Sequence, residues 1–249
     1  KPLTKQELSV FRELVERRSN GCPIAYLTGE KEFWSLKLEV NENTLIPRPD
    51  TEILVEYAVI QIREWQKKNP HSECQIAELG TGTAAIPLSL CSELENLRII
   101  SVDCKNKILK LASRNISRYN SLLNPRNNKV KLLKSDLFSS FDPKLKLDFI
   151  ISNPPYIPSK NIDDLQVEIS NFEPRIALDG GHDGLKFYRY LLETGSDFLK
   201  SNGEMLLEIG SFSESELENI LNKNRFWISS SFFKDFQGKN RVWNIKKNN

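Results

Sequence analysis

The spacing of apolar residues changes from segment to segment along the chain, and this pattern predicts strands that alternate with helices. Short segments that read as buried strands recur at 75–79, 97–102, 129–134 and 147–152. Small apolar residues at 84–91 predict a helix after the first of them. Later segments predict a helix at 184–200, a strand at 204–209, a helix through Leu221, and strands near 227–233 and 241–245. This alternation predicts an α/β fold with a mostly parallel sheet, whose late paired strands are antiparallel.

The region before the first of these strands has a different pattern. Thr4 is placed to cap an amphipathic helix, whose apolar face is Leu8, Phe11, Leu14 and Val15. That face is expected to pack on the main domain or on further helices that precede it. Alternating apolar residues from Phe33 to Val40 predict strand, with a hairpin turn at 41–43. Asp50 or Thr51 is then predicted to cap a helix that runs through Trp65.

Composition narrows the class of protein. The chain has 249 residues and a net charge of +2, which lacks the strong excess of positive charge typical of nucleic-acid-binding proteins. Its four cysteines have no C-x-x-C spacing and it has two histidines, so we expect no metal site and reduced thiols. No signal peptide or transmembrane stretch is visible. We therefore expect a cytoplasmic protein with no membrane association.

The segment Asn153-Pro154-Pro155-Tyr156 directly follows the predicted strand at 147–152. Pro155 excludes Pro154 from the helical region, and neither proline donates a backbone hydrogen bond. The chain therefore leaves the strand in a rigid, extended form. The Asn153 Oδ1 and a proline carbonyl are suited to accept the two hydrogens of a planar NH2 group. A strand-terminating turn is the alternative interpretation.

A Gly-rich turn, Gly80-Thr81-Gly82-Thr83, joins the first predicted strand to its helix, and Asp103 ends the next strand. Strand, glycine turn and helix open the nucleotide-binding α/β folds, in which a later acidic residue binds ribose hydroxyls. Ala85 replaces the third glycine of dinucleotide sites, and Glu78 would repel a pyrophosphate but attract an ammonium. These features favour S-adenosylmethionine over NAD. A glycine turn without a ligand is the alternative.

The predicted strand at 129–134 is followed by Asp136 and Leu137. Asp136 is placed to accept a hydrogen bond from an adenine amine, with Leu137 or Phe138 against the base. A turn or helix-capping aspartate is the alternative. Because parallel strands end at the same edge of a sheet, the residues after all four strands are expected to share one site.

Six segments together resemble one known family. They lie at 23–29, 32–35, 45–52, 78–83, 152–157 and 172–178. The chain resembles the HemK/PrmC family, protein-(glutamine-N5) methyltransferases that act on class-1 peptide chain release factors. The Asn-Pro-Pro-Tyr motif is shared with adenine and guanine amino-methyltransferases, whereas the Pro-Arg-Pro-Asp-Thr-Glu segment at 47–52 is more discriminating.

The resemblance implies a Rossmann-like class I methyltransferase sheet with a small N-terminal helical and hairpin appendage. Residues 1–28 would be the remnant of a helical substrate-docking domain, 29–70 a β-hairpin and connecting helix, and 71–249 the methyltransferase domain. It implies methyl transfer from S-adenosylmethionine to the glutamine of a Gly-Gly-Gln motif in a release factor. We expect a monomer that binds no nucleic acid stably.

The resemblance also assigns residues. Asn153 and Pro154 would hold the substrate amide, Pro155 would fix the turn, Tyr156 would wall the substrate side chain, and Arg48 would contact the substrate or form a lid. The cofactor-binding residues would be Glu78, Gly80, Thr81, Gly82, Thr83, Ala84, Asp103, Asp136, Leu137 and Asn153. The loop at 172–184 is expected to pack over the site.

Two residues depart from the family pattern. Ala84 stands where glycine is usual and would restrict the turn if a positive φ is needed there. Pro87 stands where a helix former is expected. Two other functions therefore stay open: methyl transfer to an exocyclic amine of adenine or guanine in RNA or DNA, and cofactor binding without catalysis.

Overall fold

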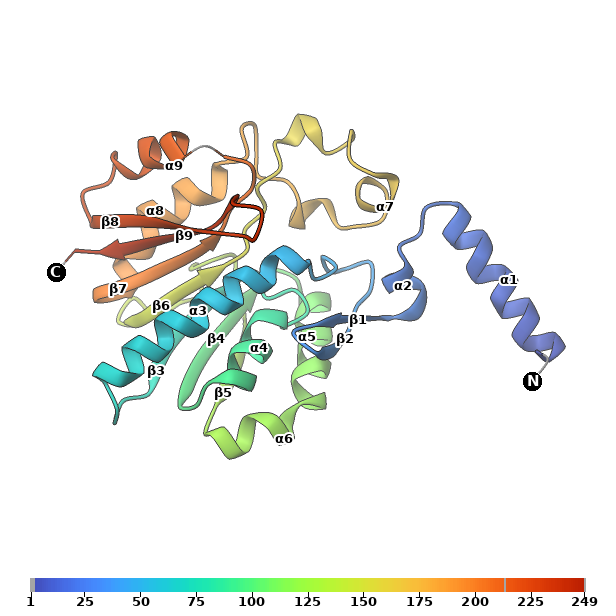
Figure 1. Cartoon of the computed structure of the whole chain (residues 1–249), viewed down its shortest axis with the longest axis horizontal. Helices are drawn as coiled ribbons and strands as arrows, with labels where there is room; N and C mark the ends of the chain where they lie inside the picture. Colours follow the sequence, from blue (N-terminus) through green and yellow to red (C-terminus); the bar gives the residue numbers. More distant parts are fainter. Residues whose placement is uncertain (1–2, 213, 249) are drawn as a thin grey trace.

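A computed structural model describes residues 3–212 and 214–248. Seven strands of this part form one sheet in the order β5-β4-β3-β6-β7-β9-β8 (Figure 1). They are β3 (Cys74–Leu79), β4 (Leu97–Asp103), β5 (Lys129–Lys134), β6 (Leu147–Ser152), β7 (Leu199–Glu208), β8 (Trp227–Lys234) and β9 (Asn240–Lys247). Strands β3 to β7 pair in parallel, and β9 is antiparallel to β7 and β8. The predicted sheet and its antiparallel end are confirmed.

Helices cover both faces of this sheet (Figure 1). The long ones are α3 (Pro49–Lys68), α4 (Ala85–Glu93), α5 (Asn106–Arg118), α8 (Lys186–Phe198) and α9 (Glu214–Leu221); α6 (Asn120–Leu123) and α7 (Val167–Ser170) are short. Phe149 and Ile151 of β6 share a core with α3 and α4, whereas Ile150 shares a core with α8 and α9. Alternate strand residues thus fill two apolar layers. None of the described helices is long and apolar enough to cross a membrane.

The N-terminal helix α1 (Lys5–Ser19) begins as predicted, because the Thr4 hydroxyl accepts a hydrogen bond from the Glu7 N–H. Its apolar residues Leu8, Phe11 and Val15 are 37%, 55% and 50% exposed. The expectation that this face packs on the main domain is therefore wrong within the described residues. In Figure 1, α1 projects away from the sheet, and the short α2 (Ile24–Thr28) follows it.

Strands β1 (Glu30–Phe33) and β2 (Leu36–Glu39) form a separate two-stranded hairpin. Its turn is Trp34-Ser35, where both residues have positive φ, 51° and 59°. The chain also turns at 41–44, where the Thr44 N–H donates to the Asn41 carbonyl at 3.0 Å, but the prediction that this turn closes the hairpin is wrong. A turn like that at Trp34-Ser35 normally contains asparagine or glycine, so the sequence carried no local signal for it. Tertiary contacts hold it instead: the Trp34 N–H donates to the Glu52 carboxylate at 2.8 Å.

Helix α3 begins at Pro49, with Arg48 as its N-cap residue. The cap predicted at Asp50 or Thr51 is therefore wrong. A proline in the first helical position loses no hydrogen bond and has the φ of a helix, so it starts the helix two or three residues earlier than predicted. Thr51 lies in the first turn and is buried. Its hydroxyl is thereby left for another partner.

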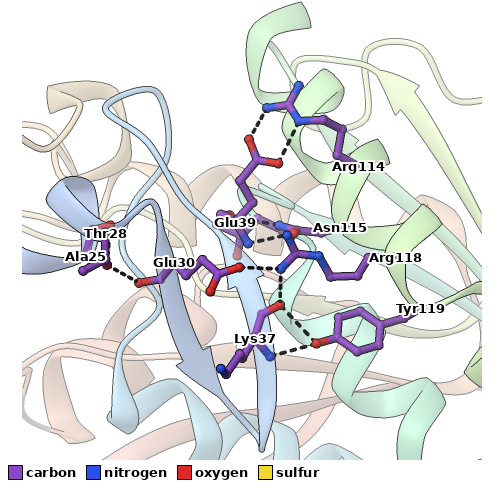
Figure 2. Close-up of polar contacts among 10 residues, drawn as sticks. Ala25, Thr28, Glu30, Lys37, Glu39, Arg114, Asn115, Arg118 and Tyr119 are labelled. Atoms are coloured by element: carbon purple, nitrogen blue, oxygen red, sulfur yellow. Dashed lines mark hydrogen bonds and ion pairs between the residues drawn. The ribbon is translucent and has the colours of Figure 1, made fainter. Parts of the chain in front are cut away.

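Three side chains of helix α5 and that of its C-cap residue, Tyr119, bind the outer edge of the hairpin (Figure 2). The buried Asn115 accepts from the Glu39 N–H at 2.8 Å and donates to the Glu39 carbonyl at 3.0 Å. Tyr119 makes the same pair of contacts with Lys37, and Arg114 pairs with the Glu39 carboxylate. Arg118 donates to Glu30 and to the Lys37 carbonyl. These side chains take the place of a third strand, because they form the hydrogen bonds that the free backbone groups on this edge of β2 would otherwise lack.

Asn115 also donates to the carbonyl of Thr83, at 3.0 Å, which joins the hairpin to the Gly-rich turn. We predict that Asn115→Ala lowers the free energy of unfolding by about 2–4 kcal/mol, because it leaves buried backbone groups unpaired. Urea denaturation measures this loss. Tyr119→Phe is the matched control at the more exposed end of the same edge, with an expected loss of about 1 kcal/mol. Equal losses in the two variants would contradict a special role for Asn115.

Candidate functional site

A cavity of about 200 Å³ lies at the edge where β3, β4, β5 and β6 end. The structure brings most of the predicted site residues to its walls: Arg48, Glu78, Gly80, Thr81, Gly82, Thr83, Asp103, Asp136, Leu137, Asn153, Pro154 and Pro155. Two predicted site residues, Ala84 and Tyr156, are absent from these walls. The arrangement follows from the parallel sheet, which places the residues after each strand at one edge.

The Gly-rich turn is held by backbone hydrogen bonds. The N–H groups of Gly80 and Thr81 both donate to the Val102 carbonyl, at 3.0 and 2.9 Å. The Gly82 N–H donates to the Asp103 carboxylate at 3.2 Å. Gly80 and Gly82 have φ values of 79° and 51°, a region that favours glycine. Asp103 thus shapes the turn as well as facing the cavity.

Ala84 occupies the left-handed region, with φ 64° and ψ 28°, and is fully buried. The turn therefore does need a positive φ at the residue that departs from the family pattern, at a cost of roughly 1–2 kcal/mol for a non-glycine residue. Helix α4 begins at Ala85, so Pro87 lies in its first turn, where no intrahelical N–H bond is lost. Neither departure obstructs the cavity.

Beneath the turn lie polar atoms without partners. Glu78 Oε2, Thr81 Oγ1 and Ser101 Oγ are buried and have no hydrogen-bond partner among the described residues. Burial raises the pKa of Glu78 from 4.5 to about 8, and burial also raises that of Asp103. An unpaired buried carboxyl is costly unless a cation or a donor meets it. These groups fit a ligand that carries an ammonium and hydroxyl groups, as S-adenosylmethionine does.

The Asn-Pro-Pro-Tyr segment leaves β6 next to the Gly-rich turn. The Ser152 hydroxyl donates to the Leu79 carbonyl at 2.8 Å, which joins the two strand ends. The Asn153 Nδ2 donates to Thr51 Oγ1 at 3.0 Å. Among the described residues, the Asn153 Oδ1 has no partner. The segment therefore offers the cavity one free amide oxygen beside Pro154 and Pro155.

Three glycines allow the chain to pack closely against Tyr156. A Cβ at Gly184 would lie 2.4 Å from the Tyr156 carbonyl oxygen, and one at Gly180 would lie 2.8 Å from the Tyr156 Cα. A Cβ at Gly210 would lie 2.7 Å from the Tyr156 ring. Only glycine permits such approaches, so these positions fix the backbone that follows the prolines. The role of Tyr156 as a wall of the substrate site stays a prediction.

Arg48 pairs with Glu173, a buried carboxylate on the loop that the sequence predicts to cover the site. Glu173 also accepts from the Ile46 N–H at 3.2 Å. Ile176 and Ala177 of the same loop line the cavity. The ion pair therefore joins the start of α3 to the covering loop. Arg48 was predicted to contact the substrate, and one of its guanidinium nitrogens is already bound to Glu173.

Several cavity residues were missed from the sequence: Asn43, Thr44, Leu45, Pro47, Thr51, Ile108, Ser135 and Phe187. Thr51 lies inside the Pro-Arg-Pro-Asp-Thr-Glu segment, which is the one signal that would have found it. Leu45 and Pro47 also lie in the family segment at 45–52, whereas the others come from loops and helix ends that carry no local motif. The described residues contain no group of three or more histidine, cysteine or acidic side chains that could hold a metal ion.

The raised pKa of Glu78 has a consequence for stability. Because the folded pKa, about 8, lies above the ordinary 4.5, the folded state binds more protons between these values, and this group lowers stability as pH rises. We predict that Glu78→Gln is more stable than the natural chain at pH 8.5, by an amount that shrinks toward pH 5. Urea denaturation across this range measures it, with the exposed Glu16→Gln as control. A pH-independent difference would contradict a buried, ionisable Glu78.

Known proteins match the chain along nearly its whole length. Sequence models of the PrmC N-terminal domain and of the methyltransferase small domain match residues 1–29 and 62–170. Release factor glutamine methyltransferases of Pasteurella multocida and Fusobacterium nucleatum are 40% and 36% identical; the matches cover 96% and 98% of this chain, and 80% and 66% of those proteins. A methyltransferase structure from Pyrococcus furiosus aligns with a TM-score of 0.57 at 20% identity over 96% of this chain and 100% of its own.

These matches confirm the predicted class I methyltransferase fold and S-adenosylmethionine as the cofactor. The Pasteurella multocida relative shows the family, since the match at 40% identity covers 96% of this chain and 80% of that protein. The chain therefore belongs to the release factor glutamine methyltransferase family.

Proposed function

We propose that this chain transfers a methyl group from S-adenosylmethionine to the side-chain nitrogen of the glutamine in the Gly-Gly-Gln motif of class-1 peptide chain release factors. The observation that carries the proposal is the Asn153 amide. Its Nδ2 is bound to Thr51, so its free Oδ1 remains for a donor in the same cavity as the Gly-rich turn. A primary amide supplies that donor.

An amide nitrogen is a weak nucleophile because its lone pair is delocalised into its carbonyl. The chemistry supplied by S-adenosylmethionine is a methyl group on a sulfonium, so transfer to the amide yields a neutral thioether and one proton. Asn153 Oδ1 and the Pro154 carbonyl would accept from the two amide hydrogens. They would thereby orient the nitrogen and stabilise the positive charge that grows on it.

The cofactor would be held by the residues around the turn. Glu78 supplies a carboxyl for the ammonium, and Asp103 supplies one for the ribose hydroxyls. Asp136 and Leu137 would receive the adenine. The fit rests on the unpartnered atoms Glu78 Oε2 and Thr81 Oγ1, which are buried beside the turn.

The N-terminal region would dock the protein substrate. The exposed apolar face of α1 and the match of residues 1–29 to the PrmC N-terminal domain support this division of the chain. The hydrogen bonds from Asn115 and Tyr119 to the hairpin would fix the position of the preceding N-terminal region relative to the cavity. We further propose that the protein acts in the cytoplasm as a monomer and does not bind nucleic acid stably.

We predict that Asn153→Ala lowers kcat by about 100- to 1000-fold, the range seen when a preorganised transition-state contact is lost. The dissociation constant for S-adenosylmethionine should stay within a few-fold, because the Gly-rich turn is untouched. Transfer of radiolabelled methyl to a purified release factor, with calorimetric titration of the cofactor, measures the two effects. Unchanged turnover would refute the role of Asn153.

We predict that Asp103→Ala weakens cofactor binding by about 1–3 kcal/mol, because it leaves hydroxyl groups of the ligand and the Gly82 N–H without an acceptor. Isothermal titration with S-adenosylmethionine measures the loss. Asp142→Ala, on an exposed segment away from the cavity walls, is the control. Equal affinities in all three proteins would remove Asp103 from the site.

A further inference from the structure

A second buried carboxyl, Glu208, lies beside the proposed reaction centre and takes no part in the proposed methyl transfer. Glu208 is the last residue of β7 and is 1% exposed. Ser152 and Leu207 are partners in the parallel pairing of β6 with β7, so the next residues, Asn153 and Glu208, lie at the same level of the sheet edge, where Glu208 still pairs with Val242 of β9. Among the described residues, Glu208 Oε2 has no hydrogen-bond partner.

Thr51 connects these two residues. Its hydroxyl oxygen accepts from the Asn153 Nδ2 at 3.0 Å, and the same side chain lies close enough to the Glu208 carboxyl to lower the pKa of that group. A hydroxyl has one hydrogen to donate and two lone pairs. When that hydrogen goes to an ionised Glu208, only acceptor capacity remains toward Asn153. The amide can then present only its NH2 to Thr51, and its oxygen is turned toward the cavity.

We propose that Thr51 and Glu208 are positioning residues, which fix the Asn153 amide in the orientation that presents its oxygen to the substrate. The inference rests on the proposed function, because only a substrate NH2 requires an acceptor at this place. It assigns a task to a threonine of the Pro-Arg-Pro-Asp-Thr-Glu segment, 102 residues from Asn153 in the sequence. It also gives a role to a carboxyl whose burial is costly.

The orientation depends on the proton of Glu208. A protonated Glu208 would donate to Thr51, which would free the Thr51 hydrogen to bind the Asn153 oxygen and would let the amide rotate. Its NH2 would then oppose the NH2 of the substrate.

The groups that face Glu208 set the pH of this change. Asp50 lies at the start of α3 and Arg48 before it, and Arg241 lies on β9. Tyr156 follows β6, and Tyr188 of α8 donates to the Glu208 backbone carbonyl. Burial is the largest influence and raises the pKa of Glu208 from 4.5 to about 7. We therefore expect the productive orientation above pH 7 and its loss as the pH falls below that value.

Nuclear magnetic resonance of the Asn153 side-chain amide tests the inference without any substrate. Its 15N–1H2 signals are assigned by their absence from Asn153→Ala. We expect them to shift with a midpoint near pH 7 in the natural chain, and to show no such titration in Glu208→Gln or Thr51→Val. Signals that ignore pH in the natural chain, or that titrate alike in all three proteins, would overturn the proposal.

Kinetics test the same link on the reaction. Thr51→Val keeps the shape of the side chain without its hydroxyl, and Thr51→Ser keeps the hydroxyl. We expect Thr51→Val to lower kcat by about 10- to 100-fold, with cofactor affinity within a few-fold, and Thr51→Ser to retain most of kcat. Glu208→Gln should remove the acidic limb of the kcat profile. A turnover in Thr51→Val equal to the natural chain would refute the role of Thr51.

The two experiments separate this inference from the proposed function. If the natural chain methylates a release factor while Thr51→Val matches it, the inference fails and the function stands. If the natural chain transfers no methyl group but the Asn153 signals titrate through Thr51 and Glu208, the function fails and the positioning link stands.

Discussion

The parallel pairing of β3 with β6 at the centre of the sheet is the constraint on which the site depends. It aligns Leu79 with Ser152, and the Ser152 hydroxyl binds the Leu79 carbonyl at 2.8 Å. The chain leaves these two neighbouring strands in two different ways, through a Gly-rich turn and through a pair of prolines. Because both exits lie at one edge, a cofactor site and an amide-binding group meet in one cavity.

Three buried glutamates contact residues that line the cavity or line it themselves. Glu173 holds Arg48 and the Ile46 N–H, Glu78 lies under the Gly-rich turn, and Glu208 lies beside Thr51. Burial raises the pKa of Glu78 and Glu208 well above that of a free carboxyl, which costs folding free energy near neutral pH. Such a cost is typical of sites whose electrostatics serve a ligand rather than the fold.

Much of this structure could be predicted because its signals are local. The buried strand at 147–152 and the proline pair after it are read directly from residue type, and the structure gives β6 the same bounds. The hairpin turn could not be predicted, since Trp34 and Ser35 adopt positive φ only because Glu52 and the α5 contacts hold the hairpin there. Local propensity was overridden by tertiary contacts.

The parts of the site that the sequence did not reveal depend on pairs distant along the chain. The partner of Arg48 lies 125 residues away, and the partner of Thr51 lies 102 residues away. Tyr156 is not among the residues that line the cavity, and Gly180, Gly184 and Gly210 allow close packing around it, while its role as a wall of the substrate site stays a prediction. Ala84 is the reverse case: its left-handed backbone could be foreseen from the family pattern, and the structure has it.

Mass spectrometry of a purified class-1 release factor, incubated with this protein and S-adenosylmethionine, tests the central claim most directly. We predict a gain of one methyl group, mapped to the glutamine of the Gly-Gly-Gln motif, and no gain when the cofactor is omitted. A release factor that stays unmodified while calorimetry shows cofactor binding, or a methyl group on any other residue, would contradict it.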